Sequence, residues 1–182
     1  MRVIAGKARR LQLKTPQGRN TRPTTDRIKE TLFNMLQDEI VDIHFLDLFS
    51  GSGAIGIEAL SRGAEWACFV EQDRTAADII RQNLIHTGLD GQAEIYPCTA
   101  LSAVRQLQDK MRFHVVFMDP PYGKGLEAEL LADPAFYRIL QERALIIVEA
   151  DLHTDLCVRE DCFRILKEKI YKTNKHIFLE RI

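Results

Sequence analysis

Residues 47–56 read Asp-Leu-Phe-Ser-Gly-Ser-Gly-Ala-Ile-Gly, and an apolar run over residues 44–49 leads into them. A helical pattern follows directly, so the glycines lie where a strand turns into a helix. Gly51 and Gly53 permit positive φ angles and a close approach of the backbone to a ligand, and Gly56 allows the helix to pack tightly on a sheet. This stretch predicts an α/β domain with a ligand at its first turn.

The rest of the chain alternates between strand-like and helix-like patterns. The expected strands are residues 44–49, 66–71, 93–98, 113–118, 144–149, 163–168 and 175–181. The expected helices span residues 23 to about 40, 52–61 and 100–108. A further helix begins after residue 71 and ends at Gly88, and another lies within the region 126–142. Repeated βα units predict an α/β fold with a Rossmann-like, doubly wound, mostly parallel seven-stranded sheet and an antiparallel C-terminal strand.

Length and composition exclude several classes of protein. With 182 residues, 46% hydrophobic and 28% charged, the chain fits one globular domain rather than a disordered or fibrous protein. Apolar runs stay far below the roughly 18 residues of a membrane span, and no secretory signal is visible. The four cysteines form no CxxC pair and the five histidines no ligand spacing. We expect a cytoplasmic, monomeric protein with reduced thiols and no metal.

The net charge of −1 conceals an uneven distribution. Residues 1–29 carry nine basic side chains and one acidic one, a local charge of +8, whereas the other 153 residues carry 16 basic and 25 acidic side chains. Residues 1–22 lack core-forming periodicity, apart from a small hairpin around Gly6. We therefore expect a basic N-terminal extension over residues 1–22 and a ligand-binding domain over residues 23–182. Such an extension suits a polyanionic partner, or it is a solvated tail.

Glu71 ends the second expected strand and can accept hydrogen bonds from two ribose hydroxyls. Its spacing of 20 residues from Gly51 fits both NAD and S-adenosylmethionine. Asp47 favours S-adenosylmethionine, because a carboxylate there repels a pyrophosphate but attracts a cationic aminoacyl group. No hydride-transfer apparatus is evident. The alternative is that the glycine turn is purely structural and binds no ligand.

The fourth expected strand runs directly into Asp119-Pro120-Pro121-Tyr122. An exocyclic amine on a base is a poor nucleophile because its lone pair is delocalised into the ring. The Asp119 carboxylate and the Pro120 carbonyl can accept its two N–H bonds and aim the lone pair at a donor methyl, which makes alignment the main catalytic factor. Tyr122 offers a face on which the base stacks. A strand-end turn with a capping Asp119 and a surface tyrosine is the structural alternative.

With both motifs in place, the chain resembles the class I S-adenosylmethionine-dependent methyltransferases that modify amino groups, and more narrowly the RsmD-type 16S ribosomal RNA guanine-N2 methyltransferases. Besides the two motifs, the resemblance rests on residues 2–7 (RVIAGK), 22–27 (RPTTDR) and 30–34 (ETLFN). It implies methylation of guanine 966 in 16S rRNA, within a partly assembled small subunit. It also implies that the donor contacts Asp47, Ser50, Gly51, Gly53 and Glu71, and that the guanine meets Asp119, Pro120 and Tyr122.

Two further sets of contacts are expected. Many methyltransferases place an acid or amide after the third strand to bind the adenine amine, and here Thr99 stands in that region. RNA phosphates are expected to meet Arg9, Arg10, Arg19, Arg22 and Arg27. Arg22 and Arg27 flank the start of the first helix, where they either line the site entrance or pair locally.

Other functions compete with this interpretation. A DNA adenine-N6 or cytosine methyltransferase shares the tetrad but usually adds a target-recognition region that 182 residues do not accommodate. A protein glutamine methyltransferase uses a similar tetrad without so basic an extension. A non-catalytic nucleotide-binding module explains the glycines but leaves the tetrad without a role.

Overall fold

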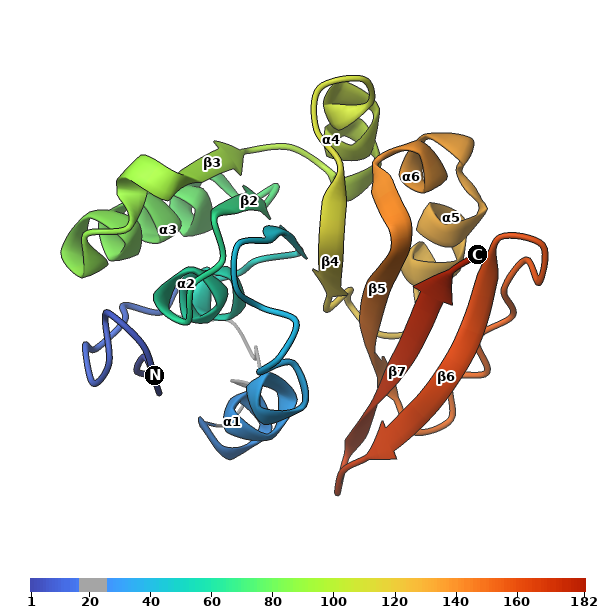
Figure 1. The fold of residues 1–182 in the computed structure, drawn as a ribbon, viewed down its shortest axis with the longest axis horizontal. Helices are drawn as coiled ribbons and strands as arrows, with labels where there is room; N and C mark the ends of the chain where they lie inside the picture. The colour runs from blue at the N-terminus through green and yellow to red at the C-terminus, as the bar shows by residue number, and fades with distance from the viewer. Residues whose placement is uncertain (17–25) are drawn as a thin grey trace.

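A seven-stranded sheet forms the middle layer of the molecule, in the order β3-β2-β1-β4-β5-β7-β6 (Figure 1). The computed structural model describes residues 1–16 and 26–182. The strands are β1 (His44–Leu48), β2 (Trp66–Val70), β3 (Ala93–Tyr96), β4 (Phe113–Met118), β5 (Leu140–Asp151), β6 (Phe163–Ile170) and β7 (Asn174–Arg181). The helices are α1 (Asp26–Met35), α2 (Ala54–Ser61), α3 (Arg74–Thr87), the 3-10 turn η1 (Asp90–Gln92), α4 (Ala100–Leu107), α5 (Leu126–Ala132) and α6 (Pro134–Arg138).

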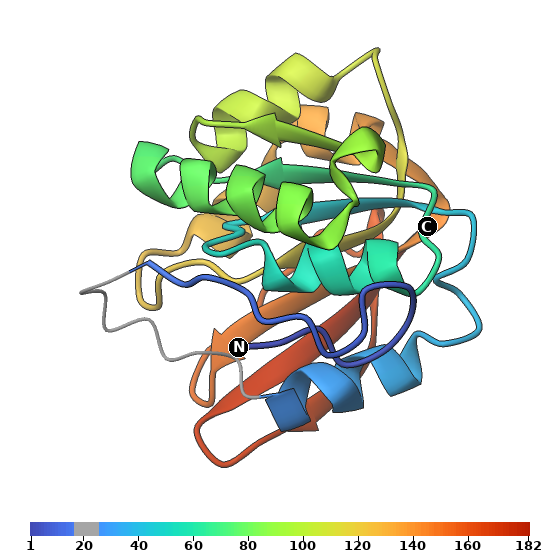
Figure 2. The same ribbon diagram turned by 90° about the vertical axis from the view of Figure 1, so that its left-hand side faces the viewer.

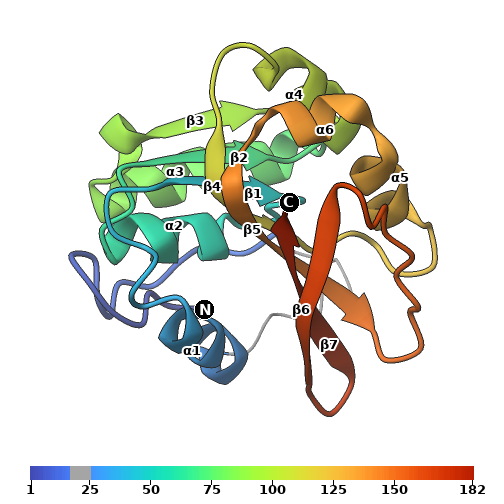
Figure 3. The same cartoon turned by 45° about the vertical axis from the view of Figure 1, so that its right-hand side comes forward.

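The connectivity confirms the predicted doubly wound sheet. Strands β1 to β5 are parallel to their neighbours, while β7 runs antiparallel between β5 and β6. The strand order reverses between β1 and β4, and ligands of open α/β sheets bind at such a switch point, beyond the carboxyl ends of the strands. Figure 3 shows β6 at the edge of the sheet, joined to β7 by a tight turn.

Alternating side chains of each central strand pack on opposite faces of the sheet. Val115 and Phe117 of β4 contact a core that includes the N-terminal segment and helices α1, α2 and α3. Val116 and Met118 contact a second core, built with helices α4, α5 and α6. Figure 2 shows α2, α3 and the N-terminal segment together on the first face. Both faces are covered, which explains why the strands read as continuous apolar runs.

Local signals placed most element boundaries correctly. Gly88 ends α3 in the left-handed conformation (φ 67°), with its N–H bonded to the Ile85 carbonyl, as its C-cap position predicts. The prediction of a single helix within residues 126–142 is wrong, because two helices, α5 and α6, lie there. Pro134 cannot continue α5, so Asp133 caps a new helix by accepting the Ala135 N–H at 2.8 Å. Strand β5 then begins at Leu140, earlier than expected.

The N-terminal segment, residues 1–16, packs into the protein body. Val3, Ala8 and Leu13 are buried, so the expectation that this region lacks core positions is wrong for its described part. The predicted hairpin is present, with a bridge between Arg2 and Gln12. Gly6 has φ 82°, and a Cβ there would lie 1.7 Å from the carbonyl oxygen of Ser61, so only glycine allows this close packing on α2.

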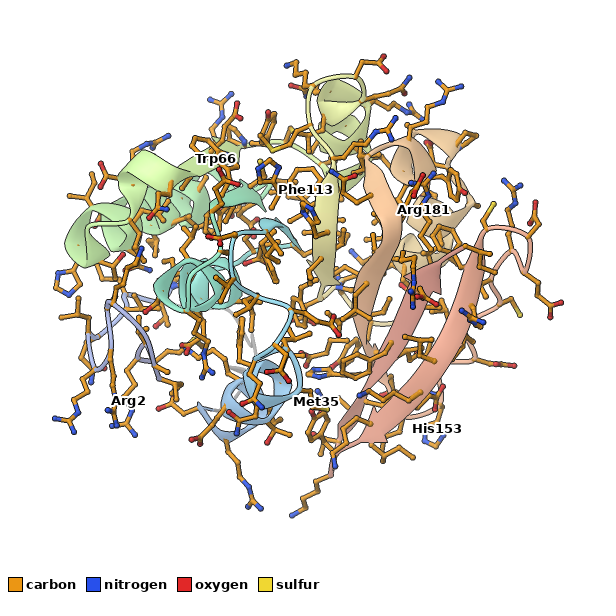
Figure 4. The ribbon with its side chains drawn as sticks, viewed as in Figure 1. Arg2, Met35, Trp66, Phe113, His153 and Arg181 are labelled. Atoms are coloured by element: carbon orange, nitrogen blue, oxygen red, sulfur yellow. The ribbon has the colours of Figure 1, made fainter. Side chains whose placement is uncertain are left out.

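A buried carboxylate fixes the segment to α2. Glu58 accepts the backbone N–H groups of Ile4 at 2.8 Å and Ala5 at 3.0 Å. Its remaining partners are cationic: Lys29 Nζ lies 3.2 Å away and Arg62 Nε 2.8 Å away. Lys29 is buried, and burial lowers its pKa while Glu58 opposes that shift. The start of the chain, α1 and α2 therefore form one unit, and Figure 4 shows Arg2 at its periphery.

Candidate functional site

The predicted glycine turn lies between β1 and α2 and is held by backbone hydrogen bonds. The Ser50 hydroxyl donates to the Asp47 carbonyl at 2.6 Å and accepts the Val70 N–H at 3.0 Å, which ties the turn to β2. The Gly53 N–H bonds to the Ser50 carbonyl at 2.7 Å. Phe49 has φ 63°, an unusual value for a residue with a bulky side chain. Sequence reasoning did not single out Phe49.

The three glycines of the turn serve different purposes. A Cβ on Gly56 would lie 2.4 Å from the Phe69 ring, which confirms that Gly56 is needed for α2 to pack on the sheet. Gly53 has φ 76°, and its Cβ would crowd Ile80 at 3.1 Å. Gly51 has φ 56° and no atom within 4 Å of the Cβ position. The backbone at Gly51 therefore borders open space in which a ligand can approach.

Two carboxylates hold this turn. Asp47 is 2% exposed and accepts the Gly56 N–H at 2.9 Å. Burial raises its pKa to about 7; the Gly56 hydrogen bond opposes this shift, and the charge of Glu71 adds to it. Glu71 accepts the Gly51 N–H at 3.0 Å and the Asp73 N–H at 2.8 Å. Glu71 therefore ties the glycine turn to the end of β2 and brings a carboxylate, a group that accepts hydrogen bonds, to this turn.

Beyond Glu71 lies a hollow of about 600 Å³ between the ends of β2 and β3. It is lined by Gln72, Asp73, Cys98, Thr99 and Ser102. Thr99 caps α4 by accepting the Ser102 N–H at 3.3 Å, and it is exposed to the hollow. The structure thus brings Thr99 to the same edge of the sheet as Glu71 and the glycine turn.

The Asp-Pro-Pro-Tyr tetrad begins where β4 ends, next to the glycine turn. The Asp119 N–H bonds to the Leu48 carbonyl at 3.4 Å. Burial raises the pKa of Asp119 well above its ordinary value, and the negative charges of Glu149 and Asp47 raise it further. Pro120 is buried, whereas Tyr122 is 48% exposed and can present its ring to a ligand.

Sequence reasoning missed Glu149, which lies in the last part of β5. It is 7% exposed, and the Tyr122 hydroxyl lies 3.5 Å from its Oε1. Met118 pairs with Val148, so Asp119 and Glu149 follow aligned positions on neighbouring parallel strands. An acid directly after the apolar run 144–148 was the available signal. Four carboxyl groups therefore gather at this edge of the sheet, those of Asp47, Glu71, Asp119 and Glu149.

The arginines predicted to contact RNA are separated in space. Arg9 and Arg10 are exposed, and the adjacent Lys7 and Ala8 bond to Ser61 at the far end of α2 from the glycine turn. An eight-residue helix spans about 12 Å, so these two arginines are not part of the carboxylate site. Arg27 is exposed in the first turn of α1. Arg19 and Arg22 lie outside the described residues.

The far end of the N-terminal segment does reach the glycine turn. The buried Asn83 of α3 accepts the Lys14 N–H and donates to the Lys14 carbonyl, both at 2.9 Å. It also donates to the Ser52 carbonyl at 2.9 Å. Asn83 therefore ties the backbone at Lys14 to the glycine turn through one buried amide.

Within residues 1–16 and 26–182, no helix is long and apolar enough to cross a membrane. The same part of the chain contains no group of three or more side chains able to hold a metal ion. All four cysteines are free.

Chemically, this edge favours a ligand that is cationic near Asp47 and Asp119, donates hydroxyl hydrogen bonds to Glu71 and extends into the hollow. Tyr122 and Asp119 can hold a flat group that carries an amine. The proline carbonyl between them supplies a second acceptor for such an amine.

The chain is similar to known proteins in sequence and in fold. A family described as Conserved hypothetical protein 95 matches residues 1–180. Ribosomal RNA small subunit methyltransferase D of Escherichia coli (strain K12) is 39% identical over 173 residues, 93% of this chain and 84% of that protein. Its namesake in Haemophilus influenzae is 38% identical over 170 residues, 93% of this chain and 88% of that protein. The solved yhhF structure from Escherichia coli superposes with a TM-score of 0.83 at 36% identity, covering 100% of this chain and 97% of that one.

Proposed function

This chain belongs to the Conserved hypothetical protein 95 family and is an RsmD-type methyltransferase, and from this premise we propose that it methylates the exocyclic N2 amine of a guanine in 16S ribosomal RNA, position 966 in the usual rRNA numbering. S-adenosylmethionine is the proposed methyl donor. A small-subunit assembly particle is the proposed form of the substrate. The observation that carries the proposal is the adjacency of two sites at one sheet edge: an anionic glycine turn and the Asp119 tetrad.

The residues at the glycine turn fit this donor. Gly51 leaves open space beside the backbone, the Glu71 carboxylate can accept hydrogen bonds from ribose hydroxyls, and Thr99 lines a hollow suited to an adenine ring. The buried Asp47 favours a cationic aminoacyl group and disfavours a pyrophosphate, which argues against NAD. When bound, S-adenosylmethionine supplies a methyl group activated by its sulfonium.

The tetrad acts by alignment. The Asp119 carboxylate and the Pro120 carbonyl accept the two amine hydrogens of the guanine, so that the nitrogen lone pair faces the donor methyl. The exposed ring of Tyr122 stacks on the base, a contact worth about 1–3 kcal/mol in single-stranded recognition. The amine proton becomes acidic after methylation, so its departure requires no strong base.

The basic N-terminal region is proposed to hold RNA phosphates. Because residues 1–16 are fixed to α2, Arg9 and Arg10 occupy defined positions at the far end of α2, where they suit RNA away from the target base. Replacing Arg9, Arg10 and Arg19 together by alanine should weaken RNA binding and flatten its dependence on salt. An unchanged salt slope would contradict this role.

The decisive experiment uses small-subunit particles that lack the modification. The protein is incubated with them and with tritiated S-adenosylmethionine, and the labelled nucleosides are then identified. We expect N2-methylguanosine. Label in another nucleoside, such as N6-methyladenosine, or in none, would refute the proposal. Asp119→Ala should bind the donor normally by calorimetry but transfer no methyl group; transfer at the wild-type rate would refute the aligning role of Asp119.

A further inference from the structure

A chain of polar side chains, three of them buried and one half-buried, lies behind the exposed Tyr122. Glu149 accepts a hydrogen bond from Asn174 Nδ2 at 2.6 Å, and His176 Nε2 lies 3.3 Å from its other oxygen. His176 Nδ1 in turn lies 3.3 Å from the Tyr171 hydroxyl. We call Glu149, Asn174, His176 and Tyr171 the β7 polar cluster. None of these residues has a role in the function proposed above.

The sheet register assembles the cluster. Glu149 pairs directly with His176 across β5 and β7, and Asn174 begins β7 two residues earlier. The Tyr171 N–H bonds to the Asn174 carbonyl at 2.8 Å, which closes the turn before β7. The antiparallel C-terminal hairpin thus places an amide and an imidazole against the Glu149 carboxylate of β5.

Packing leaves His176 little freedom to move. It is fully buried, and its ring makes edge contacts with Tyr171, Phe117 and Phe178 at centroid distances of 4.9, 5.9 and 6.4 Å. A neutral imidazole satisfies both of its polar contacts, with Nε2–H donating to Glu149 and Nδ1 accepting from Tyr171. Glu149 is therefore held from two directions by side chains of an ordered strand.

Tyr122, in front of the β7 polar cluster, is exposed rather than buried. Tyr122 is 48% exposed, and its hydroxyl approaches Glu149 Oε1 at 3.5 Å. This distance is long for a hydrogen bond, as is common in ligand-free sites, where such contacts shorten when the ligand binds. A ring already restrained loses less conformational entropy when a base stacks on it.

We propose that Glu149 is a positioning residue of the base pocket: the β7 polar cluster fixes its carboxylate, and that carboxylate orients the Tyr122 ring through the tyrosine hydroxyl. The inference rests on the proposed function for its substrate, a guanine base, but the orienting contact itself is a property of the protein alone. The reaction then depends on β7, a strand that carries none of the sequence motifs.

Kinetic measurements test the coupling between the two residues. Tyr122→Phe and Glu149→Gln should each lower kcat/KM for RNA about tenfold, mainly through KM, the size expected for one hydrogen bond to a charged group. Donor affinity should stay unchanged. The double variant should be no worse than either single variant, because both changes remove one contact. The matched controls are Tyr137→Phe, which removes a hydroxyl bonded to the Ile182 carbonyl, and Glu180→Gln, which weakens the ion pairs of Glu180 with Arg143 and Arg164.

A spectroscopic measurement tests the orientation without catalysis. The chain has four tyrosines, so protein labelled with 3-fluorotyrosine should give four fluorine resonances, and Tyr122→Phe identifies one of them. Glu149→Gln should shift or broaden that resonance, whereas Glu180→Gln should not. An unchanged Tyr122 resonance, or multiplicative losses of kcat/KM in the double variant, would overturn the inference. If wild-type protein methylates no guanine but the resonance responds, the proposed function fails while the positioning role stands.

Discussion

Binding of S-adenosylmethionine should strengthen as the pH rises through about 7, because of Asp47. This carboxyl group is 2% exposed, and burial raises its pKa to about 7 in the ligand-free protein. A cationic aminoacyl group beside it favours the ionised form. Below about pH 7, binding must therefore release a proton from Asp47.

The magnitude follows from the pKa. If the complex returns Asp47 toward its ordinary value of 3.8, the dissociation constant should be about 25-fold weaker at about pH 5.5 than at about pH 7.5. At about pH 6.5, binding should release about 0.8 proton. Isothermal titration calorimetry in two buffers of different ionisation enthalpy measures both quantities.

Variants identify the responsible group. Asp47→Asn should remove the pH dependence, whereas Asp119→Asn should keep most of it, although the pKa of Asp119 is also raised. S-adenosylhomocysteine, which retains the aminoacyl group but lacks the sulfonium, should show the same slope. A wild-type dissociation constant that stays level from about pH 5.5 to about 7.5, or an equal slope in Asp47→Asn, would refute the reasoning.

The raised pKa of Asp47 also makes the free energy of unfolding depend on pH. Since the folded state holds the Asp47 proton up to about pH 7 and the unfolded chain loses it near 3.8, the contribution of Asp47 to the free energy of unfolding falls as the pH rises across that interval. Asp47→Asn should therefore raise the melting temperature of the ligand-free protein at about pH 8 and have a smaller effect at about pH 4. A lower melting temperature at the higher pH would contradict this.

Three further predictions concern the framework of the site. Gly56→Ala should lower the free energy of unfolding by about 1–3 kcal/mol in urea titrations, because its Cβ would lie 2.4 Å from the Phe69 ring; a neutral effect would show that α2 shifts freely. Glu58→Ala should cost about 3–5 kcal/mol, since it leaves Lys29 buried without its carboxylate, and a cost below about 1 kcal/mol would argue against a buried charge there. Asn83→Ala should speed amide hydrogen exchange at residues 14–16 and weaken donor binding, because it removes three backbone contacts; unchanged exchange would show that Asn83 does not hold the segment.

Much of the fold could be predicted from local patterns. The alternation of strands and helices gave the sheet, and Gly88 marked the end of α3. The prediction of one helix within 126–142 was wrong because Pro134 interrupts it. The proline is visible in the sequence, but the helical periodicity around it carried more weight in the prediction. The prediction for the N-terminal segment was wrong for another reason. Its three core residues are widely spaced and meet partners that no local pattern reveals.

The site divides in the same way. Asp47, Gly51, Glu71 and Asp119 lie at strand ends, so short motifs sufficed to predict that they gather at one edge of a parallel sheet. The positions of the N-terminal arginines could not be predicted in this way. Arg9 and Arg10 precede the site in sequence, yet the segment that carries them turns at the far end of α2.

The sequence by itself determined the parts of this protein that depend on neighbouring residues: the turn at Gly51 and the tetrad at Asp119. Only the tertiary structure decided that Glu58 buries the start of the chain and that Glu149 meets Tyr122 and His176. The physical reason is that a buried carboxylate needs hydrogen-bond donors, whatever their distance along the chain. Sheet register and helix packing, set by the whole core, supply donors 53 and 54 residues away from Glu58, and 27 residues away on both sides of Glu149.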